Sequence, residues 1–337
     1  MSLRARAVPW ILVLSVLVAS TAGAATTLKL ATLVPEGSVW DKELKEMGQD
    51  WREQTEGRVA LRIYPGGVAG SEGDVLRKMR IGQLHAATLT VIGLSEIEPG
   101  FHVFAIPRFF RSYQELFHVV EALTPMFEQR LAEKGYVLLN WGHAGWIQLF
   151  TKEPVRTPGD LQKLKLFTSA GDAEMVQWWK KNGYDPVALS STDVMTGLQT
   201  GMVEALPTTP LAALTLQWYR ATPYMLDLGI APLVGATIVA ESTWERVDPA
   251  DREVLRKEAR EVGERLEKAV PEQDERAIQE MVERGLELTR PEGEAEKEAW
   301  EEEAKQFAAT MRQLLVPDDV FEAAKKARDE YRGESGE

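Results

Sequence analysis

The amino-acid sequence predicts an α/β protein in which two units of alternating strands and helices are followed by a long helical region. Short apolar stretches with strand character alternate with helix-length amphipathic stretches over residues 27–92 and again over residues 154–210. From about Asp248 the chain becomes helix-forming and rich in acidic residues. Alternation of strands and helices is typical of parallel sheets joined by right-handed crossovers, so each unit predicts an α/β lobe.

The N-terminus has the pattern of an export signal. Arg4 and Arg6 precede an apolar stretch at residues 8–19, and Ala22-Gly23-Ala24 is a typical cleavage motif. We therefore expect a signal peptide at residues 1–24 and a mature protein in the periplasm. The alternative is an uncleaved membrane anchor, but this apolar stretch is shorter than the ~20 residues that a membrane-spanning helix needs.

The first unit is expected to follow the order strand, helix, strand, helix, strand. The strands are predicted at residues 27–33, 58–64 and 86–92. Helices are predicted to start at Ser38 and Ser71, because each serine precedes an aspartate by three residues, a spacing typical of helix N-termini.

The connection between the two units is predicted from four consecutive features. An aromatic stretch comes first, then a helix from Ser112 to Lys134, a buried strand at 136–141 and a glycine-containing crossing at 142–146.

The second unit contains the stretch on which the functional argument depends. Strands are predicted at 164–167, 187–189 and 202–206, with helices at 172–181 and 192–201 between them. Ligands of parallel α/β sheets bind at the carboxyl ends of the strands. Those ends are Phe167-Thr168-Ser169 and, after the third strand, the threonine-rich loop that contains Thr208 and Thr209.

The remaining elements are predicted from apolar runs and helical periodicity. Strands are expected at 225–228 and 236–240, the second returning to the first unit. Pro271 lies within the acidic helical region and is expected to kink or break it, because proline cannot donate a helical hydrogen bond. Amphipathic helices are expected at 294–315 and 318–331.

Composition excludes several classes of function. The 337 residues carry a net charge of −13, which disfavours a nucleic-acid partner, and contain no cysteine, which excludes disulfides and a thiol nucleophile. The four histidines lack metal-ligand spacing, and no phosphate-binding loop or G-x-S-x-G motif occurs. We therefore expect no metal, no cofactor and no enzymatic activity. The alternative is a secreted hydrolase, for which the best available nucleophile and base are Ser169 and His143.

Aromatic and hydroxyl side chains near the predicted strand ends are the candidates for ligand binding. Aromatic rings provide apolar contact and hydroxyl groups provide orientation in small-molecule sites. The candidates are Trp146, Phe167, Thr168, Ser169, Thr208, Thr209, Trp40, Thr90 and Trp218. For Thr208 and Thr209, which lie between two prolines, the alternative is a plain helix cap. Trp178 and Trp179 are adjacent on a predicted helix, so at least one of them is expected in the core.

Five segments together resemble the solute-binding subunit of a tripartite ATP-independent periplasmic (TRAP) transporter. They are TEGRVALRIYPGG (55–67), KMRIGQLHAA (78–87), AIPRFF (105–110), KEPVRTPGDLQKLKL (152–166) and DVMTGLQTGMVEALPTTP (193–210). The resemblance, of the dicarboxylate-receptor type, covers nearly the whole mature chain.

The resemblance implies a two-lobed periplasmic binding protein of the type II-like class with hinge strands. Lobe I would comprise 25–145 with about 234–263, and lobe II 146–233 with about 264–331. It also implies a ligand held between the lobes and delivered to TRAP permease subunits in the membrane, with a monomer as the default state and a dimer as an alternative. A sensory receptor that docks on a membrane kinase is a further alternative that the sequence does not separate from transport.

One departure from the pattern of this family bears on the ligand. Members that bind organic acids usually carry an arginine directly after the segment that is K-L-K-L (163–166) in this chain, where it pairs with the ligand carboxylate. This chain has Phe167 there. Burying a carboxylate without its cation is costly, so we expect an apolar or neutral ligand. The alternative is an organic acid held by a non-standard anchor.

Overall fold

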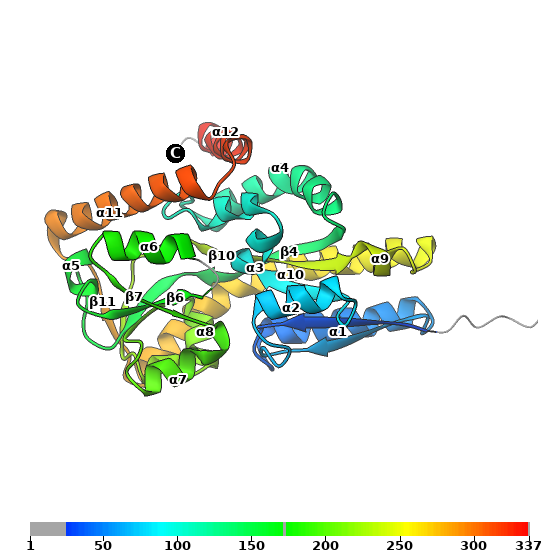
Figure 1. Ribbon diagram of the computed structural model, residues 1–337, viewed down its shortest axis with the longest axis horizontal. Helices are drawn as coiled ribbons and strands as arrows, with labels where there is room; N and C mark the ends of the chain where they lie inside the picture. The colour runs from blue at the N-terminus through cyan, green and yellow to red at the C-terminus, as the bar shows by residue number, and fades with distance from the viewer. Residues whose placement is uncertain (1–24, 171–172, 336–337) are drawn as a thin grey trace, which may run out of the picture.

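The computed structural model describes residues 25–170 and 173–335 (Figure 1). The predicted signal peptide at 1–24 lies outside the described residues. The strands are β1 (Thr26–Thr32), β2 (Val59–Tyr64), β3 (Ala86–Thr90), β4 (Tyr136–Trp146), β5 (Gln148–Thr151), β6 (Lys165–Ser169), β7 (Asp185–Leu189), β8 (Ala205–Thr208), β9 (Tyr224–Leu226), β10 (Pro232–Ala240) and β11 (Glu287–Thr289).

The helices cover both faces of the sheets. They are α1 (Val39–Gln54), α2 (Glu72–Arg80), α3 (Val91–Ile97), α4 (Tyr113–Ala132), α5 (Pro158–Leu161), α6 (Ala173–Lys181), α7 (Val194–Gln199), α8 (Pro210–Thr215), α9 (Glu241–Trp244), α10 (Pro249–Glu283), α11 (Gly293–Leu314) and α12 (Asp318–Ser335), with short 3-10 turns η1 (Pro99–Ala105), η2 (Ser191–Asp193) and η3 (Trp218–Arg220). No helix in the described part of the chain is both long enough and apolar enough to cross a membrane.

The strands form two sheets, one in each lobe. The first sheet has the order β2-β1-β3-β10-β4, and the second has the order β11-β9-β5-β8-β6-β7. β1, β2 and β3 are parallel, as the βαβαβ pattern predicts, whereas β10 runs antiparallel between β3 and β4. The predicted α/β, two-lobed fold is confirmed.

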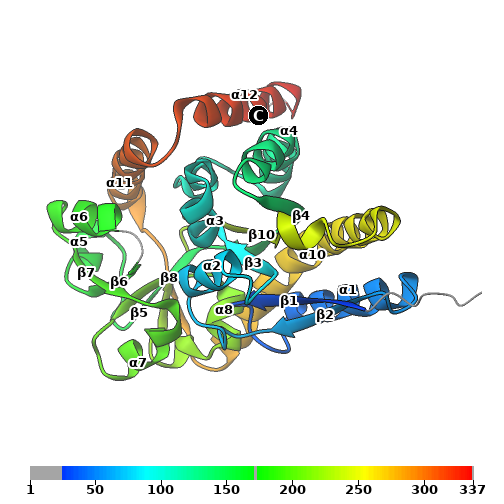
Figure 2. The same cartoon turned by 45° about the vertical axis from the view of Figure 1, so that its right-hand side comes forward.

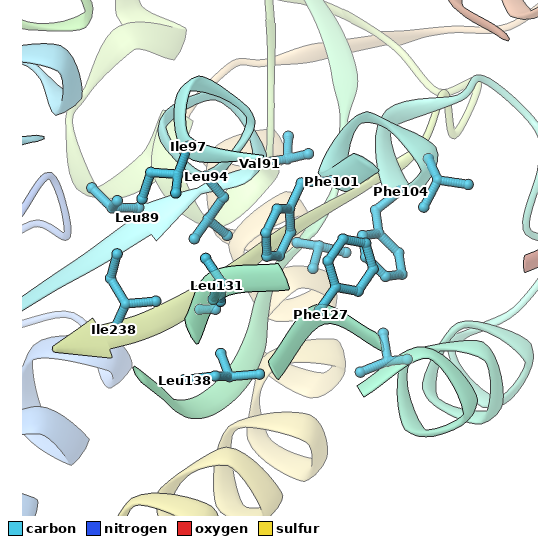
Figure 3. Close-up of a cluster of buried hydrophobic side chains, with 14 of the residues drawn as sticks. Leu89, Val91, Leu94, Ile97, Phe101, Phe104, Phe127, Leu131, Leu138 and Ile238 are labelled. Atoms are coloured by element: carbon cyan, nitrogen blue, oxygen red, sulfur yellow. The ribbon is translucent and has the colours of Figure 1, made fainter. Parts of the chain in front are cut away.

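The first lobe is built around an apolar core between the sheet and its helices. Figure 3 shows part of this core, where Leu89 of β3 and Ile238 of β10 lie near Leu94 of α3 and Leu131 of α4. Phe101 and Phe127 also belong to this core, with ring centroids 4.3 Å apart. This core fixes the carboxyl end of β3, which faces the second lobe.

Two extended segments cross side by side between the lobes. β4 continues through Ile147 into β5, and residues 227–231 lead back into β10. Ile147 donates its backbone N–H to Ala231 O at 2.8 Å and accepts one from Ile230 at 2.9 Å. The side-chain oxygen of Gln148 accepts two further backbone hydrogen bonds, from Leu228 and Gly229. These bonds satisfy the backbone of a connection that would otherwise be a loose linker.

Helix α10 is a third connection, and it contributes to the cores of both lobes. Its N-terminal half packs Leu255 and Leu266 on the first sheet. Its C-terminal half packs Met281 against Phe150 of β5. With 35 residues the helix is roughly 50 Å long, which is enough to span both lobes (Figure 2).

Of the expected kink or break at Pro271, the break does not occur, because α10 is continuous through this residue. A proline leaves the carbonyl four residues earlier, here that of Glu267, without its helical N–H partner. The helix stays continuous because residues on both sides of Pro271 are packed, Leu266 and Val270 in the first lobe and Met281 in the second. Tertiary packing therefore maintains the helix where the proline removes a hydrogen bond.

The last two helices pack on different lobes. α11 lies along α6 of the second lobe, and Trp178 and Phe307 contact each other with ring centroids 4.6 Å apart. α12 instead packs on the first lobe, where Val320 and Ala324 join its core. The predicted boundaries grouped 264–331 with lobe II, whereas α12 belongs by its packing to the first.

Gly263 allows α10 to approach β4 closely. A Cβ atom at this position would lie 2.9 Å from the backbone oxygen of Trp141, which cannot move without disturbing the sheet. We predict that Gly263→Ala lowers the free energy of unfolding by about 1–3 kcal/mol, as overpacking does. At an unobstructed helical position, replacing glycine with alanine would instead raise the free energy of unfolding by roughly 0.5–1 kcal/mol.

Urea unfolding followed by circular dichroism tests this prediction. The matched control is Gly333→Ala in α12, where no atom lies within 4 Å of the added Cβ, and which should not destabilise the protein. Equal stability of Gly263→Ala and the parent protein would contradict the close approach.

Candidate functional site

A cavity of about 1230 Å³ lies between the lobes. The first lobe contributes the ends of β1 and β3, the second contributes the ends of β6 and β8, and Ala144, Ile147 and Val234 of the crossing segments form its base. The lobes also approach each other at Gly67, where an added Cβ would lie 3.1 Å from the methyl carbon of Thr192 in the second lobe. The cavity is therefore an interlobe cleft, somewhat larger than the roughly 300–1,000 Å³ of typical small-molecule sites.

Trp40 forms part of the first-lobe wall of the cleft. Its indole N–H donates to the backbone oxygen of His143 at 2.9 Å, which ties α1 to the crossing strand β4. The ring packs directly on Gly142, because any Cβ atom at that residue would lie 2.4 Å from a ring carbon. Trp40 thus lines the cleft, as predicted, in an orientation fixed by two neighbours.

Thr90 also lines the cleft, but its hydroxyl group is already engaged. It donates to Glu72 at 2.8 Å and accepts from the backbone N–H of Ile92 as the cap of α3. Thr209 is similar, because it is 0% exposed and accepts from the backbone N–H of Ala212 as the cap of α8. The hydroxyl groups of both residues therefore bind backbone around the cleft. For Thr209 this is the helix cap that was the alternative to ligand binding.

The second-lobe wall contains the remaining predicted strand-end residues. Phe167, Thr168 and Ser169 line the cleft at the end of β6, and Thr208 lines it at the end of β8. Within 25–170 and 173–335, the hydroxyl groups of Thr168 and Thr208 form no hydrogen bond, so both can bond to a ligand. Phe167 packs with Trp218 on the small apolar cluster of Val194 and Leu206.

Trp146 is the exception among the predicted site residues. In the described part of the chain it is not among the residues that line the cleft. The ring of Trp146 contacts Tyr113 with centroids 5.8 Å apart, while its neighbours Ala144 and Ile147 line the cleft. The crossing segment therefore contributes to the cleft, and a role of Trp146 in ligand binding stays a prediction.

The structure adds an aromatic region that the predicted set did not include. The cleft continues between α6 and α11, and we call this part the apolar compartment; it is lined by Met175, Trp178, Trp179, Tyr184, Trp300, Glu303, Phe307 and Met311. The signal in the sequence was the spacing of Trp300, Phe307 and Met311, which places an apolar stripe on an acidic helix. A solvated face is the usual interpretation of such a helix, and only its packing on α6 shows otherwise.

Few charged side chains line the cleft. Burial lowers the pKa of His102 and of His143 to about 4, so both imidazoles are neutral at pH 7. Burial also raises the pKa of Glu72 to about 7, against the hydrogen bonds from Thr90 and Gly93 that favour its charged form. No hydrogen bond between described residues joins His143 to Ser169, the pair that a hydrolase would need.

Asp274 of α10 joins the helix to both lobes beside the cleft. Its carboxylate accepts the backbone N–H of Leu211 at 3.1 Å and that of Trp146 at 3.3 Å. Gly145 provides the space, because a Cβ there would lie 2.5 Å from the same carboxylate. Burial raises the pKa of Asp274 to about 7, although both hydrogen bonds act in the opposite direction.

The fold and the cleft define a two-lobed solute-binding protein. A family model described as "Bacterial extracellular solute-binding protein, family 7" (DctP) matches residues 30–313, and the chain belongs to this family of TRAP transporter receptors.

Curated relatives have names of the same kind, and solved structures share the fold. A "Solute-binding protein" of Chromohalobacter salexigens is 26% identical over 65% of this chain and 65% of its own length, just under two thirds. The "Sialic acid-binding periplasmic protein" SiaP of Vibrio cholerae is 22% identical over 91% of this chain and 96% of its own length. A TRAP periplasmic solute-binding protein from Ralstonia eutropha H16, crystallised with bound (S)-2-acetolactate, has a TM-score of 0.82 and 21% identity over 90% of this chain and 99% of that chain.

The raised pKa of Asp274 predicts a pH dependence of stability. The ordinary pKa of the carboxyl group is 3.8 and its pKa in the folded protein is about 7, so between these values the folded state holds a proton that the unfolded state releases. The free energy of unfolding should therefore fall as pH rises from about 4 to about 7, by up to a few kcal/mol. Asp274→Asn should reduce this slope, because the amide does not titrate.

Chemical unfolding at pH 5 and pH 7.5 measures the slope. Glu72→Gln should reduce it separately, since the pKa of Glu72 is raised in the same direction. An unchanged slope in Asp274→Asn would show that this carboxyl group is already ionised at pH 5.

Proposed function

We propose that this protein is a periplasmic receptor that binds one small molecule between its lobes and delivers it unchanged to a TRAP-type membrane permease. Three features support the proposal: the export signal, the interlobe cleft and the family to which the chain belongs. Closure of two lobes around a ligand is a common way for such receptors to present it to a membrane partner. The chain is expected to act as a monomer.

We infer further that the ligand has an apolar body. The observation that carries this inference is Phe167, which lies in β6 two residues before its end, where the acid-binding members of the family usually have an arginine. Trp40 and Trp218 line the same cleft, and the apolar compartment extends it. The relatives from Vibrio and Ralstonia are named for an acid or hold one, and this chain lacks the cation that the family places at this strand end.

Enzymatic activity is the less favoured function. His143 is 1% exposed and contacts the rings of Tyr113 and Phe117, with centroids 4.8 and 5.3 Å away. A neutral imidazole held between two aromatic rings is not oriented toward Ser169 as a general base would be.

A thermal-shift screen of the purified protein tests the receptor function, because a ligand that binds the folded state raises the melting temperature. The panel should contain apolar acids, their neutral amides and sugar acids, for example octanoate, octanamide, phenylacetate, phenylacetamide and glucuronate. Stabilisation by apolar-bodied compounds and not by glucuronate supports the proposal. The proposal would be contradicted if no compound stabilised the protein, or if glucuronate were the only compound that did.

Phe167→Arg should shift the preference toward small polar carboxylates. The substitution restores a cation at the end of β6, where an arginine can form two parallel hydrogen bonds with a carboxylate. We expect affinity for glucuronate or acetolactate to increase by about tenfold or more, which isothermal titration calorimetry would measure.

Phe167→Leu is the matched control, since it keeps the site apolar and should bring no gain for these acids. If Phe167→Arg also brings no gain for any small carboxylate, Phe167 does not occupy the position of the family's arginine.

A further inference from the structure

We propose that Arg108 is the anchor for an anionic group of the ligand, so that the receptor binds carboxylates with an apolar body. This inference rests on the proposed function. It assigns to Arg108 the carboxylate-binding role that the family usually gives to an arginine at the position of Phe167. The apolar body would occupy the apolar compartment between α6 and α11, and the carboxylate would lie at the guanidinium group of Arg108.

Arg108 lies where the cleft meets the apolar compartment. It belongs to the connection between η1 and α4, and its backbone N–H donates to Ile230 O at 2.9 Å in the crossing segment. Ala105 and Ile230 pack against the core of the second lobe, together with Trp179 and Phe307 of the compartment. Arg108 lines the same cavity as these residues.

Arg108 also has no ion-pair partner among the described residues. The other arginine that lines the cavity, Arg77, forms an ion pair with Asp74. Arg108 is exposed, and over residues 25–170 and 173–335 its side chain forms neither an ion pair nor a hydrogen bond. A guanidinium group that lines a cavity and has no carboxylate partner among the described residues provides a binding site for an anion, because charge-assisted hydrogen bonds are stronger than neutral ones.

The backbone at Arg108 is also unusual. Its φ of 55° is in the left-handed region, which glycine adopts readily and side-chain-bearing residues adopt rarely. Such strained residues cluster at ligand sites, where the surrounding structure holds them. Here the backbone hydrogen bond to Ile230 holds the conformation.

Glu303 limits the ligand to a single anionic group. Its carboxyl group lines the apolar compartment, next to the hydroxyl group of Tyr184, whose pKa burial and Glu303 both raise. A second carboxylate at this end would be repelled. The ligand class that fits both ends is therefore an apolar monocarboxylate.

Isothermal titration calorimetry with matched acids and amides tests this proposal. The probes are octanoate against octanamide and phenylacetate against phenylacetamide, which differ in charge while keeping the same apolar body. The parent protein should bind each acid at least about tenfold more tightly than its amide, and Arg108→Gln should weaken acid binding by about 10- to 100-fold with little change for the amide. Arg111→Gln, three residues further along the same connection and absent from the cavity lining, is the matched control and should leave both affinities unchanged.

A second variant separates binding from folding. Arg108→Gly removes the same charge and relieves the left-handed backbone, so its melting temperature should equal or exceed that of the parent protein while acid binding is lost. Acid affinity that survives both substitutions, or equal affinity of acid and amide in the parent protein, would overturn the role of Arg108 and leave the receptor function intact. Failure of all four probes to bind would instead contradict the proposed apolar-bodied ligand.

Discussion

The contact on which the arrangement of the lobes depends is that of Asp274 with two backbone N–H groups. One of them is at the end of the crossing strand and the other is at the start of a second-lobe helix. Burying a carboxylate without a cation is costly, and the raised pKa of Asp274 reflects that cost. The same side chain satisfies two partly buried backbone donors, one on the crossing strand and one at the start of α8. It therefore joins α10 to both of these segments.

The chemistry of the cleft follows from how its walls are built. The threonines at helix starts, Thr90 and Thr209, use their hydroxyl groups on backbone, so fewer polar groups remain for a ligand than the sequence suggests. Thr168 and Thr208 are the exceptions, and they lie on neighbouring strands. Around them the walls are mainly aromatic and apolar, with neutral histidines. Affinity in such a cleft comes mainly from burial of apolar surface, while a few polar contacts select among ligands.

Much of the fold could be predicted from the sequence, because it depends on local patterns. Strand and helix periodicity located the elements of both units, and the predicted carboxyl ends of β6 and β8 do lie on the cleft. The differences have tertiary causes. The ring of Trp146 packs against Tyr113 of α4 and, in the described part of the chain, is not among the residues that line the cleft. Pro271 does not break α10, since packing on both lobes maintains the helix.

The apolar compartment and Arg108 could not be found from periodicity alone. The aromatic stripe of α11 becomes part of a cavity only because α6 lies beside it, and the two helices are more than a hundred residues apart in the sequence. Arg108 follows an aromatic run in a connection without regular structure, and only the fold places its charge beside that compartment.

The most direct test of this account is to identify a ligand that the protein selects for itself. Residues 25–337 would be incubated with a small-molecule extract of the cells that express it and analysed by native mass spectrometry, and the released compound would then be identified. The account predicts one molecule per chain, with an apolar body and a single carboxylate. A polyhydroxylated sugar acid, or a compound that carries only positive charge, would contradict it.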